Sequence, residues 1–313
     1  MYMQRIVLTG ATSMLGLALI KRATEQNIEV LAIVNPDSKR KDRIPKDDRV
    51  SVIECGLDGL KDLNLEGFGD APAGDGYDIF YHLAWASTSH AGRQDVRGHI
   101  DNISYTIDAV ELASHLGCKR FIGTGSQAEY GRHDGPLRAD TLCRPEVPYG
   151  AAKLCAGDMS RIRCAQLKME HIWTRILSAY GPYDSENTII PLEIKALLAG
   201  EHFGCTAGEQ IWELIYSEDV ADALLLLGDK GIDGKVYPIG TGDARPLRDF
   251  LEIVKNEIDP TATLGYGERA YGPGQVMHLE ADISELKKDT GFEPQVEFEE
   301  GVRRTVEYFR NRD

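Results

Sequence analysis

The chain has 313 residues, is 42% hydrophobic and carries a formal net charge of −15 at pH 7. This length and hydrophobic share allow one large α/β unit and a smaller lobe. The negative charge repels nucleic acid and acidic membrane surfaces, so we expect neither as a partner. Six cysteines without a C-x-x-C pair, and no apolar run long enough to span a bilayer, predict a cytoplasmic protein with reduced thiols. No cluster of His, Cys, Asp or Glu has metal-ligand spacing, so no metal site is expected.

Apolar runs and longer amphipathic segments alternate along the first half of the chain. Strands are expected at 5–9, 29–34, 50–54, 78–82, 119–124 and 171–177, and helices near 14–26, 96–116 and 149–169. This alternation predicts a Rossmann-type, doubly wound parallel sheet with helices on both faces. The charged stretch 39–49 and the stretch 66–78, rich in Gly and Asp, are expected to be surface loops.

The turn after the first strand has the pattern of a dinucleotide site. Gly10 allows a tight turn, Gly16 lets the next helix pack closely, and the start of that helix offers free N–H groups to a diphosphate. Ser13 stands where a three-glycine turn has glycine, so either its hydroxyl bonds to the phosphates or the backbone stays further from them. Two glycines can also serve packing alone, but their place in the first turn favours a cofactor.

The end of the second strand bears on the choice of nicotinamide cofactor. An acidic residue there would hold a ribose 2′-OH, whereas cations would meet a 2′-phosphate. Asn35 is neutral and can serve either sugar, while Ser38, Lys39 and Arg40 could gather around a phosphate. The two cations could equally belong to a solvated loop. The pattern slightly favours NADP(H) as the cofactor, with NAD(H) as the alternative.

Tyr149 and Lys153 are four residues apart, which on a helix puts both side chains on one face. Pro148 suits the first turn of such a helix. A neighbouring ammonium favours the phenolate, so we expect Lys153 to lower the phenol pKa from its ordinary value of about 10. Ser126 follows a predicted strand and could serve the same chemistry or bond its own turn. A Tyr-Lys pair also occurs on the exposed surface of helices, so the pair alone does not indicate a catalytic site.

Together with the Gly10 turn, Ser126, Tyr149 and Lys153 resemble the extended short-chain dehydrogenase/reductases, in particular their nucleotide-sugar epimerases, dehydratases and reductases. The resemblance covers nearly the whole chain and continues through 80–84, Asn102, 175–182 and 216–221. It implies an NAD(P)-binding domain of residues 1–177 with about 214–245. It also implies a C-terminal α/β substrate lobe of residues 178–213 and 246–313.

The resemblance also implies roles for individual residues. Tyr149 would exchange a proton with the reacting oxygen, Ser126 would donate to the same oxygen, and Lys153 would hold the nicotinamide ribose. The implied cofactor contacts are Gly10, Thr12, Ser13, Met14, Leu15, Gly16, Asn35, Ser38, Lys39, Leu57, Leu83, Ala84, Trp85, Asn102, Thr124, Tyr149, Lys153 and Leu177. The implied substrate contacts are Trp85, Ser126, Gln127, Ser178, Ile190, Pro191, Trp212 and Arg269.

Gln127 and Ala128 argue against one of the family's reactions, the elimination of water from the sugar. Relatives that eliminate water from a sugar carry Asp-Glu at these two places, and an amide and a methyl group cannot shuttle protons. Glu129 lies one position too late to take over that role. Stretches at 264–267, 275–278 and 281–286 resemble deoxysugar 4-ketoreductases, so we predict reduction of a 4-keto nucleotide sugar. A 4-epimerase with retained NAD, and a non-catalytic NAD(P)-binding sensor or scaffold, are the alternatives.

The substrate lobe departs from the family pattern. Trp212 and Gly272 stand where relatives have arginines that contact the nucleotide diphosphate, and Ser178 stands where an Asn is frequent. Other cations such as Arg269 or Lys195 could meet the diphosphate, or the substrate is not a typical nucleotide sugar. As in relatives, the helices near 96–116 and 149–169 are expected to pair in a homodimer.

Overall fold

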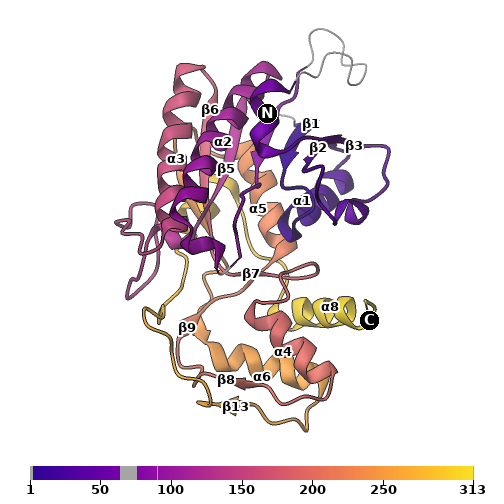
Figure 1. Cartoon of the computed structure of the whole chain (residues 1–313), viewed down its shortest axis with the longest axis vertical. Helices are drawn as coiled ribbons and strands as arrows, with labels where there is room; N and C mark the ends of the chain where they lie inside the picture. Colours follow the sequence, from indigo (N-terminus) through magenta and orange to yellow (C-terminus); the bar gives the residue numbers. More distant parts are fainter. Residues whose placement is uncertain (1–2, 64–75, 90, 313) are drawn as a thin grey trace.

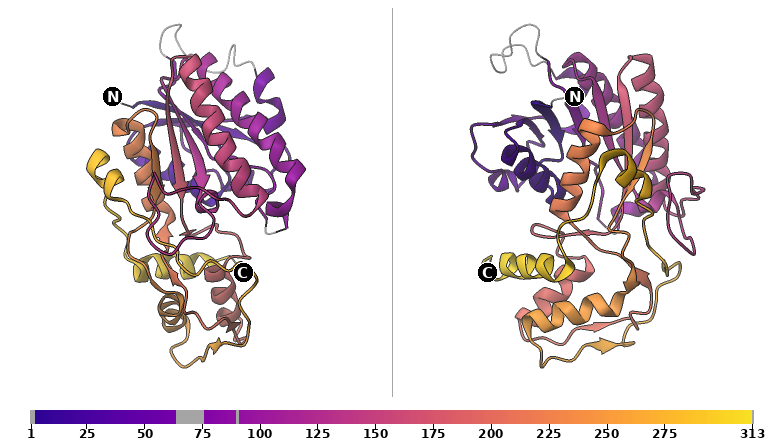
Figure 2. Two further views of the ribbon diagram at one scale, coloured as in Figure 1. Left: turned by 90° about the vertical axis from the view of Figure 1, so that its left-hand side faces the viewer. Right: turned by 180° about the vertical axis from the view of Figure 1, so that it is seen from behind.

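The computed structural model describes residues 3–63, 76–89 and 91–312, so most of the loop expected at 66–78 lies outside the described residues. A large lobe is built on one sheet, and a smaller lobe lies beyond one end of its strands (Figures 1 and 2). None of the described helices is long and apolar enough to cross a membrane.

Within the described residues, seven parallel strands form the main sheet in the order β11-β6-β5-β4-β1-β2-β3. Their bounds are β1 Arg5–Thr9, β2 Glu29–Val34, β3 Val50–Glu54, β4 Ile79–His82, β5 Arg120–Ser126, β6 Glu170–Ile176 and β11 Val236–Ile239. The strand order reverses between β1 and β4, which confirms the predicted doubly wound sheet. Ligands of such sheets bind beyond the carboxyl ends of the strands next to this reversal.

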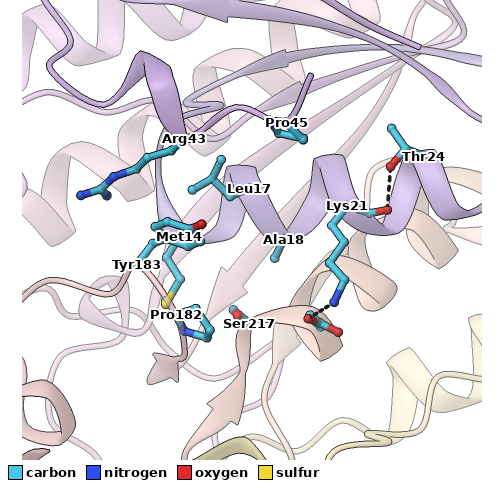
Figure 3. A pocket seen from close by; sticks show the side chains of 11 residues that line it. Met14, Leu17, Ala18, Lys21, Thr24, Arg43, Pro45, Pro182, Tyr183 and Ser217 are labelled. Atoms are coloured by element: carbon cyan, nitrogen blue, oxygen red, sulfur yellow. Dashed lines mark hydrogen bonds and ion pairs between the residues drawn. The ribbon is translucent and has the colours of Figure 1, made fainter. Parts of the chain in front are cut away.

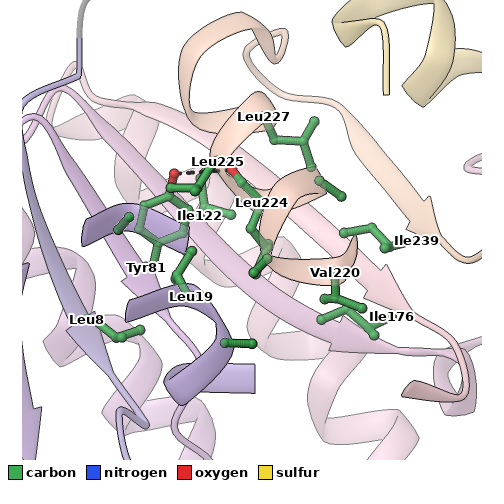
Figure 4. Packing of buried hydrophobic residues seen from close by; sticks show 14 of the residues in the cluster. Leu8, Leu19, Tyr81, Ile122, Ile176, Val220, Leu224, Leu225, Leu227 and Ile239 are labelled. Atoms are coloured by element: carbon green, nitrogen blue, oxygen red, sulfur yellow. Dashed lines mark hydrogen bonds between the residues drawn. The ribbon is translucent and has the colours of Figure 1, made fainter. Parts of the chain in front are cut away.

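The inner strands of the sheet are mostly apolar and buried because helices cover both faces of the sheet, whereas the edge strand β3 is largely exposed. The helices are α1 Met14–Glu25, α2 Val96–His115, α3 Pro148–Gln166 and α5 Ser217–Lys230. Ile6 and Leu8 of β1 face the cluster under α1 and α5, part of which is shown in Figure 4. Val7, between them, faces the opposite cluster under α2 and α3. This alternation is what the period of two in a strand requires.

The predicted elements agree with these bounds to within three residues, and the largest difference is at the end of α3. The helix ends at Gln166 rather than at 169. Lys168 has a positive φ of 59°, a left-handed conformation that does not continue a helix. The connections also contain short 3₁₀ helices, which are η1 Lys41–Arg43, η2 Leu57–Asp62, η3 Gly92–Gln94 and η4 Gln127–Glu129.

The small lobe is formed by three helices and short strand pairs around its own core. Its helices are α4 Ile189–Leu198, α6 Leu247–Ile258 and α8 Phe298–Arg310. The strand pairs are β7 Ala179–Tyr180 with β10 Ile215–Tyr216, β8 Gly204–Cys205 with β13 Gly265–Tyr266, and β9 Ile211–Trp212 with β12 Arg245–Pro246. Phe203, Phe250 and Phe298 are buried in the core that these elements share.

One part of the expected substrate lobe packs elsewhere. Leu279, Ala281, Ile283 and Leu286 belong to the cluster under the main sheet, and α7 (Ser284–Thr290) contacts α5 and β11. The placement of the whole range 246–313 in the substrate lobe is therefore wrong for this segment. Its apolar side chains find their buried surface against the main sheet.

Candidate active site

The turn between β1 and α1 needs both of its glycines. Gly10 has a φ of 78°, and a Cβ on this residue would collide with the backbone of Leu83 and Ala84 after β4. A Cβ on Gly16 would meet the carbonyl oxygen of Gly10. The predicted reason for these glycines, a tight turn with a closely packed helix, is thus confirmed.

Ser13 uses its hydroxyl to build this turn. Ser13 is the N-cap of α1, where its Oγ accepts from the Gly16 N–H at 3.0 Å and donates to the Gly10 carbonyl at 2.7 Å. In this structure the hydroxyl proton is donated within the turn, and the bond from Ser13 to a phosphate, one of the two alternatives that the sequence leaves open, stays a prediction. Met14 and Leu15 are the first two residues of α1, so their N–H groups have no helical partner. This arrangement fits a dinucleotide diphosphate.

The loop after β2 comes close to the same turn. Ser38 Oγ lies 3.4 Å from Thr12 Oγ1 and accepts from the Arg40 N–H at 3.3 Å. Asn35 uses its Oδ1 to accept from the Asp37 N–H at 2.8 Å, which stabilises its own turn. Lys39 is exposed. The structure thus brings Thr12 and Ser38 together, while Asn35 has a local structural partner.

Tyr149, Lys153 and Ser126 meet where α3 begins beside the carboxyl end of β5. Pro148 is the first residue of α3, as the sequence predicts, and Tyr149 and Lys153 are 8% and 3% exposed. Ser126 ends β5, and its side chain lies close enough to Tyr149 to lower the pKa of the phenol. Ser126 Oγ also accepts from the Ala128 N–H at 3.2 Å and donates to Gln127 Oε1 at 2.8 Å. The three predicted catalytic residues therefore form one buried cluster.

The pKa of the Tyr149 phenol is shifted upward overall, opposite to the lowering that the sequence predicts. Burial raises the pKa of Tyr149 above its ordinary value, and the cation that opposes this shift is Arg93, whose guanidinium lies 5.0 Å from the ring centre. Lys153 Nζ instead donates to the Thr124 carbonyl at 2.6 Å and lies 3.9 Å from the centre of the Trp85 ring. Burial also lowers the pKa of Lys153 to about 7. The ammonium is thus directed at a carbonyl and an indole.

Trp85 and His99 form an aromatic cluster with Tyr149. Trp85 Nε1 donates to His99 Nδ1 at 3.2 Å, and the Tyr149 ring is 5.6 Å from the His99 ring and 6.1 Å from the Trp85 ring. Asn102 holds the Trp85 loop, since its side chain bonds both the N–H and the carbonyl of Ala86. Sequence reasoning missed His99 and Arg93. His99 lies three residues before Asn102 on the same face of α2, and this spacing could have indicated that His99 belongs to the site. No comparable sequence pattern pointed to Arg93.

The remaining predicted residues have mixed placements. Leu177 and Ile190 are buried in hydrophobic clusters of the large and small lobe, and Pro191 is also buried in α4. Trp212 packs against both clusters, and Arg269 is exposed. Leu57 packs under α2, and the Ser178 carbonyl accepts from the Ile215 N–H. Lys195 forms an ion pair with Glu186 at 2.7 Å, so its charge already has a partner.

A cavity of about 260 Å³ lies on the flank of α1 (Figure 3). Leu17 and Ala18 line it from α1, and Pro45 and Pro182 line it from other segments. Lys21 pairs with Glu218 in its wall at 2.6 Å. None of the lining residues belongs to the Ser126, Tyr149 and Lys153 cluster.

A doubly wound sheet with a glycine turn after β1, and a Tyr-Lys helix at the carboxyl end of β5, define a dinucleotide-binding α/β protein. The model of the NAD dependent epimerase/dehydratase family matches residues 6–240. The chain therefore belongs to this family and is an NAD(P)-dependent enzyme, which sets the sensor or scaffold alternative aside.

Individual relatives agree with this assignment. A CDP-abequose synthase from Salmonella muenchen is 24% identical over 317 residues, which cover 97% of each chain. A dTDP-glucose 4,6-dehydratase from Salmonella typhimurium is 31% identical over 183 residues, 56% of this chain and 50% of the dehydratase. A UDP-N-acetylglucosamine 4-epimerase from Methanobrevibacter ruminantium, solved with UDP-N-acetylmuramic acid, has a TM-score of 0.87 at 25% identity over 100% of both chains.

Proposed function

We propose that the enzyme reduces the 4-keto group of a nucleotide-diphosphate (deoxy)sugar, with Tyr149 as the proton donor. The observation that carries the proposal is the buried cluster of Ser126, Tyr149 and Lys153 beside Gln127 and Ala128. The cluster supplies the groups for proton exchange at a carbonyl oxygen, and its neighbours lack the acid and base that dehydration needs. A relative that matches 97% of the chain is named for the synthesis of a CDP-linked sugar, which supports this substrate class.

The chain's own residues divide the work in this reaction. When bound, the reduced dinucleotide supplies the hydride. Tyr149 donates its phenolic proton to the carbonyl oxygen, and its raised pKa keeps the phenol protonated and ready to donate. Ser126 donates a hydrogen bond to the same oxygen as negative charge develops there. Lys153 binds the ribose hydroxyls, and in its protonated form it favours the phenolate left on Tyr149.

The proposed cofactor is NADP(H). The hydroxyls of Thr12 and Ser38 lie 3.4 Å apart, and the exposed Lys39 and Arg40 follow directly. Two hydroxyl donors beside two cations form a suitable environment for a 2′-phosphate. In the small lobe, the exposed Arg269 is the proposed diphosphate contact, since Lys195 is already paired.

The second candidate is a 4-epimerase with a retained NAD. The full-length structural match to a 4-epimerase at 25% identity favours it. The two candidates differ in the fate of the cofactor, because a reductase consumes a diffusing coenzyme and an epimerase regenerates a bound one. Stoichiometric NAD in the purified protein would favour the epimerase.

The test is a panel of 4-keto sugars linked to CDP, dTDP, GDP or UDP, each incubated with NADH or NADPH. We expect loss of reduced-nicotinamide absorbance with at least one sugar, and faster turnover with NADPH. No turnover in the wild type, or undiminished turnover in Tyr149→Phe, would contradict the proposal.

We also propose a homodimer formed through α2 and α3. Apolar side chains are exposed on both helices, with Val96 at 62%, Ile100 at 58%, Met159 at 47% and Ile162 at 47%. A second copy of the chain would remove these side chains from water, and burial of apolar area drives association of this kind.

The division into a cofactor lobe and a substrate lobe, with its boundary near residue 178, also stays a prediction.

A further inference from the structure

The carboxyl group of Glu129 is buried directly behind Ser126. Glu129 is 0% exposed, and its Oε1 accepts from the Ser126 backbone N–H at 2.8 Å and from Trp173 Nε1 at 3.1 Å. Its Oε2 accepts from Arg175 Nε at 2.7 Å. Glu129 therefore ties the residue that ends β5 to two residues of the neighbouring strand β6.

Arg175 anchors this carboxylate in the sheet. Arg175 is 5% exposed and lies opposite Gly125 in the register of β5 and β6. Its guanidinium lies 4.5 Å from the centre of the Tyr130 ring and donates to the Ala139 carbonyl at 3.2 Å. Hydrogen bonds to ionised groups are shorter and stronger than neutral ones, so a buried pair with several donors holds its geometry firmly.

Glu129 and Ser126 cap the turn η4 reciprocally. The Ser126 side chain accepts from the backbone of the turn, while the Glu129 side chain reaches back to the Ser126 N–H. Ser126 is thereby held with φ −152° and ψ 153° at the end of the strand. Since the backbone conformation sets the direction of the Cα–Cβ bond, it also sets where the hydroxyl can point.

We propose that Glu129, through its buried ion pair with Arg175, is a positioning residue that fixes the main chain of Ser126 and so aims its hydroxyl at the substrate carbonyl oxygen. This inference rests on the proposed function. Glu129 acts through Ser126 and touches neither substrate nor cofactor.

The same two strands provide a matched control at their other end. Arg120 of β5 lies opposite Glu170 of β6, and Arg120 Nη2 is 2.6 Å from Glu170 Oε2. The Arg120 side chain is 10% exposed and the Glu170 side chain is 49% exposed, so this pair is less buried than that of Glu129 and Arg175. Breaking it with Glu170→Gln perturbs the sheet without touching Ser126.

The first test needs no turnover. Hydrogen exchange followed by mass spectrometry would compare the wild type with Glu129→Val, Glu129→Gln and Glu170→Gln. We expect faster exchange of the Ser126 amide segment in Glu129→Val, a smaller change in Glu129→Gln, which keeps an acceptor, and none in Glu170→Gln. Unchanged exchange in Glu129→Val would overturn the anchoring. Glu129→Gln keeps the size of the side chain, so it remains usable if Glu129→Val does not fold.

The second test asks whether Glu129 acts through Ser126. We expect kcat to fall roughly tenfold to a hundredfold in Glu129→Val, with KM and the Kd for NADPH within about twofold of the wild type. In a Ser126→Ala background the same substitution should have no further effect, because residues that act together are not additive. An equal loss in that background, or in Glu170→Gln, would refute the positioning role. If the wild type reduces no sugar, the proposed function fails, while hydrogen exchange still decides whether Glu129 holds Ser126.

Discussion

Glu193 in the small lobe offers a direct test of how burial controls a carboxyl group. Glu193 lies in α4 and is 0% exposed, and within the described chain neither of its carboxyl oxygens has a hydrogen-bond partner. Burial raises its pKa from 4.5 to about 9, with Glu252 adding to the shift and Lys255 opposing it. The folded protein therefore keeps this carboxyl neutral at pH 7, whereas the unfolded chain ionises it.

The sign and size of the effect follow from proton linkage. Between pH 4.5 and about 9 the folded state binds more protons than the unfolded state, so the free energy of unfolding falls as pH rises. At pH 7, about 2.5 pH units above the unfolded pKa, the cost is about 3 kcal/mol at 1.36 kcal/mol per unit. Below the unfolded pKa of 4.5 the cost disappears, because both states are protonated.

Glu193→Gln keeps the size of the side chain and removes its ionisation. We expect the variant to exceed the wild type in the free energy of unfolding by about 3 kcal/mol at pH 7, and by about 1 kcal/mol or less at pH 5. Urea denaturation followed by fluorescence and circular dichroism at several pH values measures this difference. Glu257→Gln, an exposed position on α6, is the control and should leave the pH dependence unchanged. A difference that does not grow with pH would refute the reasoning and indicate an ionised, paired Glu193.

Three further predictions concern the proposed site and assembly. Tyr149→Phe should lower kcat roughly 10²- to 10⁴-fold while NADPH binding, followed by fluorescence, persists; Tyr105→Phe, a half-buried tyrosine of α2, should retain activity. Arg40→Glu should reduce kcat/KM for NADPH about tenfold relative to NADH, and an equal loss with both coenzymes would contradict a 2′-phosphate contact. Ile162→Glu should convert the dimer to a monomer in light scattering, whereas Ile232→Glu, exposed outside α2 and α3, should not.

Local sequence patterns were sufficient for strands β1 to β6 and helices α1 to α3 of the large lobe, because parallel strands and their covering helices leave strong signals. Strand β11 and helix α5 were expected only from the family resemblance, which placed about 214–245 in this lobe. A strand buried on both faces is a continuous apolar run, and an amphipathic helix repeats every three to four residues. Single residues mark where a helix begins or ends, such as Pro148 at the start of α3. The segment around Leu279 was placed wrongly because its apolar side chains do not say which of two cores will bury them.

The sequence by itself determined strands β1 to β6 of the main sheet, the glycine turn after β1, and the Ser126, Tyr149 and Lys153 pattern that we propose handles protons. Only the tertiary structure decided their environment. Lys153 turns to Thr124 and Trp85, and burial raises the Tyr149 pKa, because these effects depend on neighbours distant in the chain and on exclusion of water. Glu129, one place too late in sequence for acid-base work, accepts a hydrogen bond from the Ser126 N–H and pairs with Arg175, which the parallel pairing of β5 and β6 brings beside it.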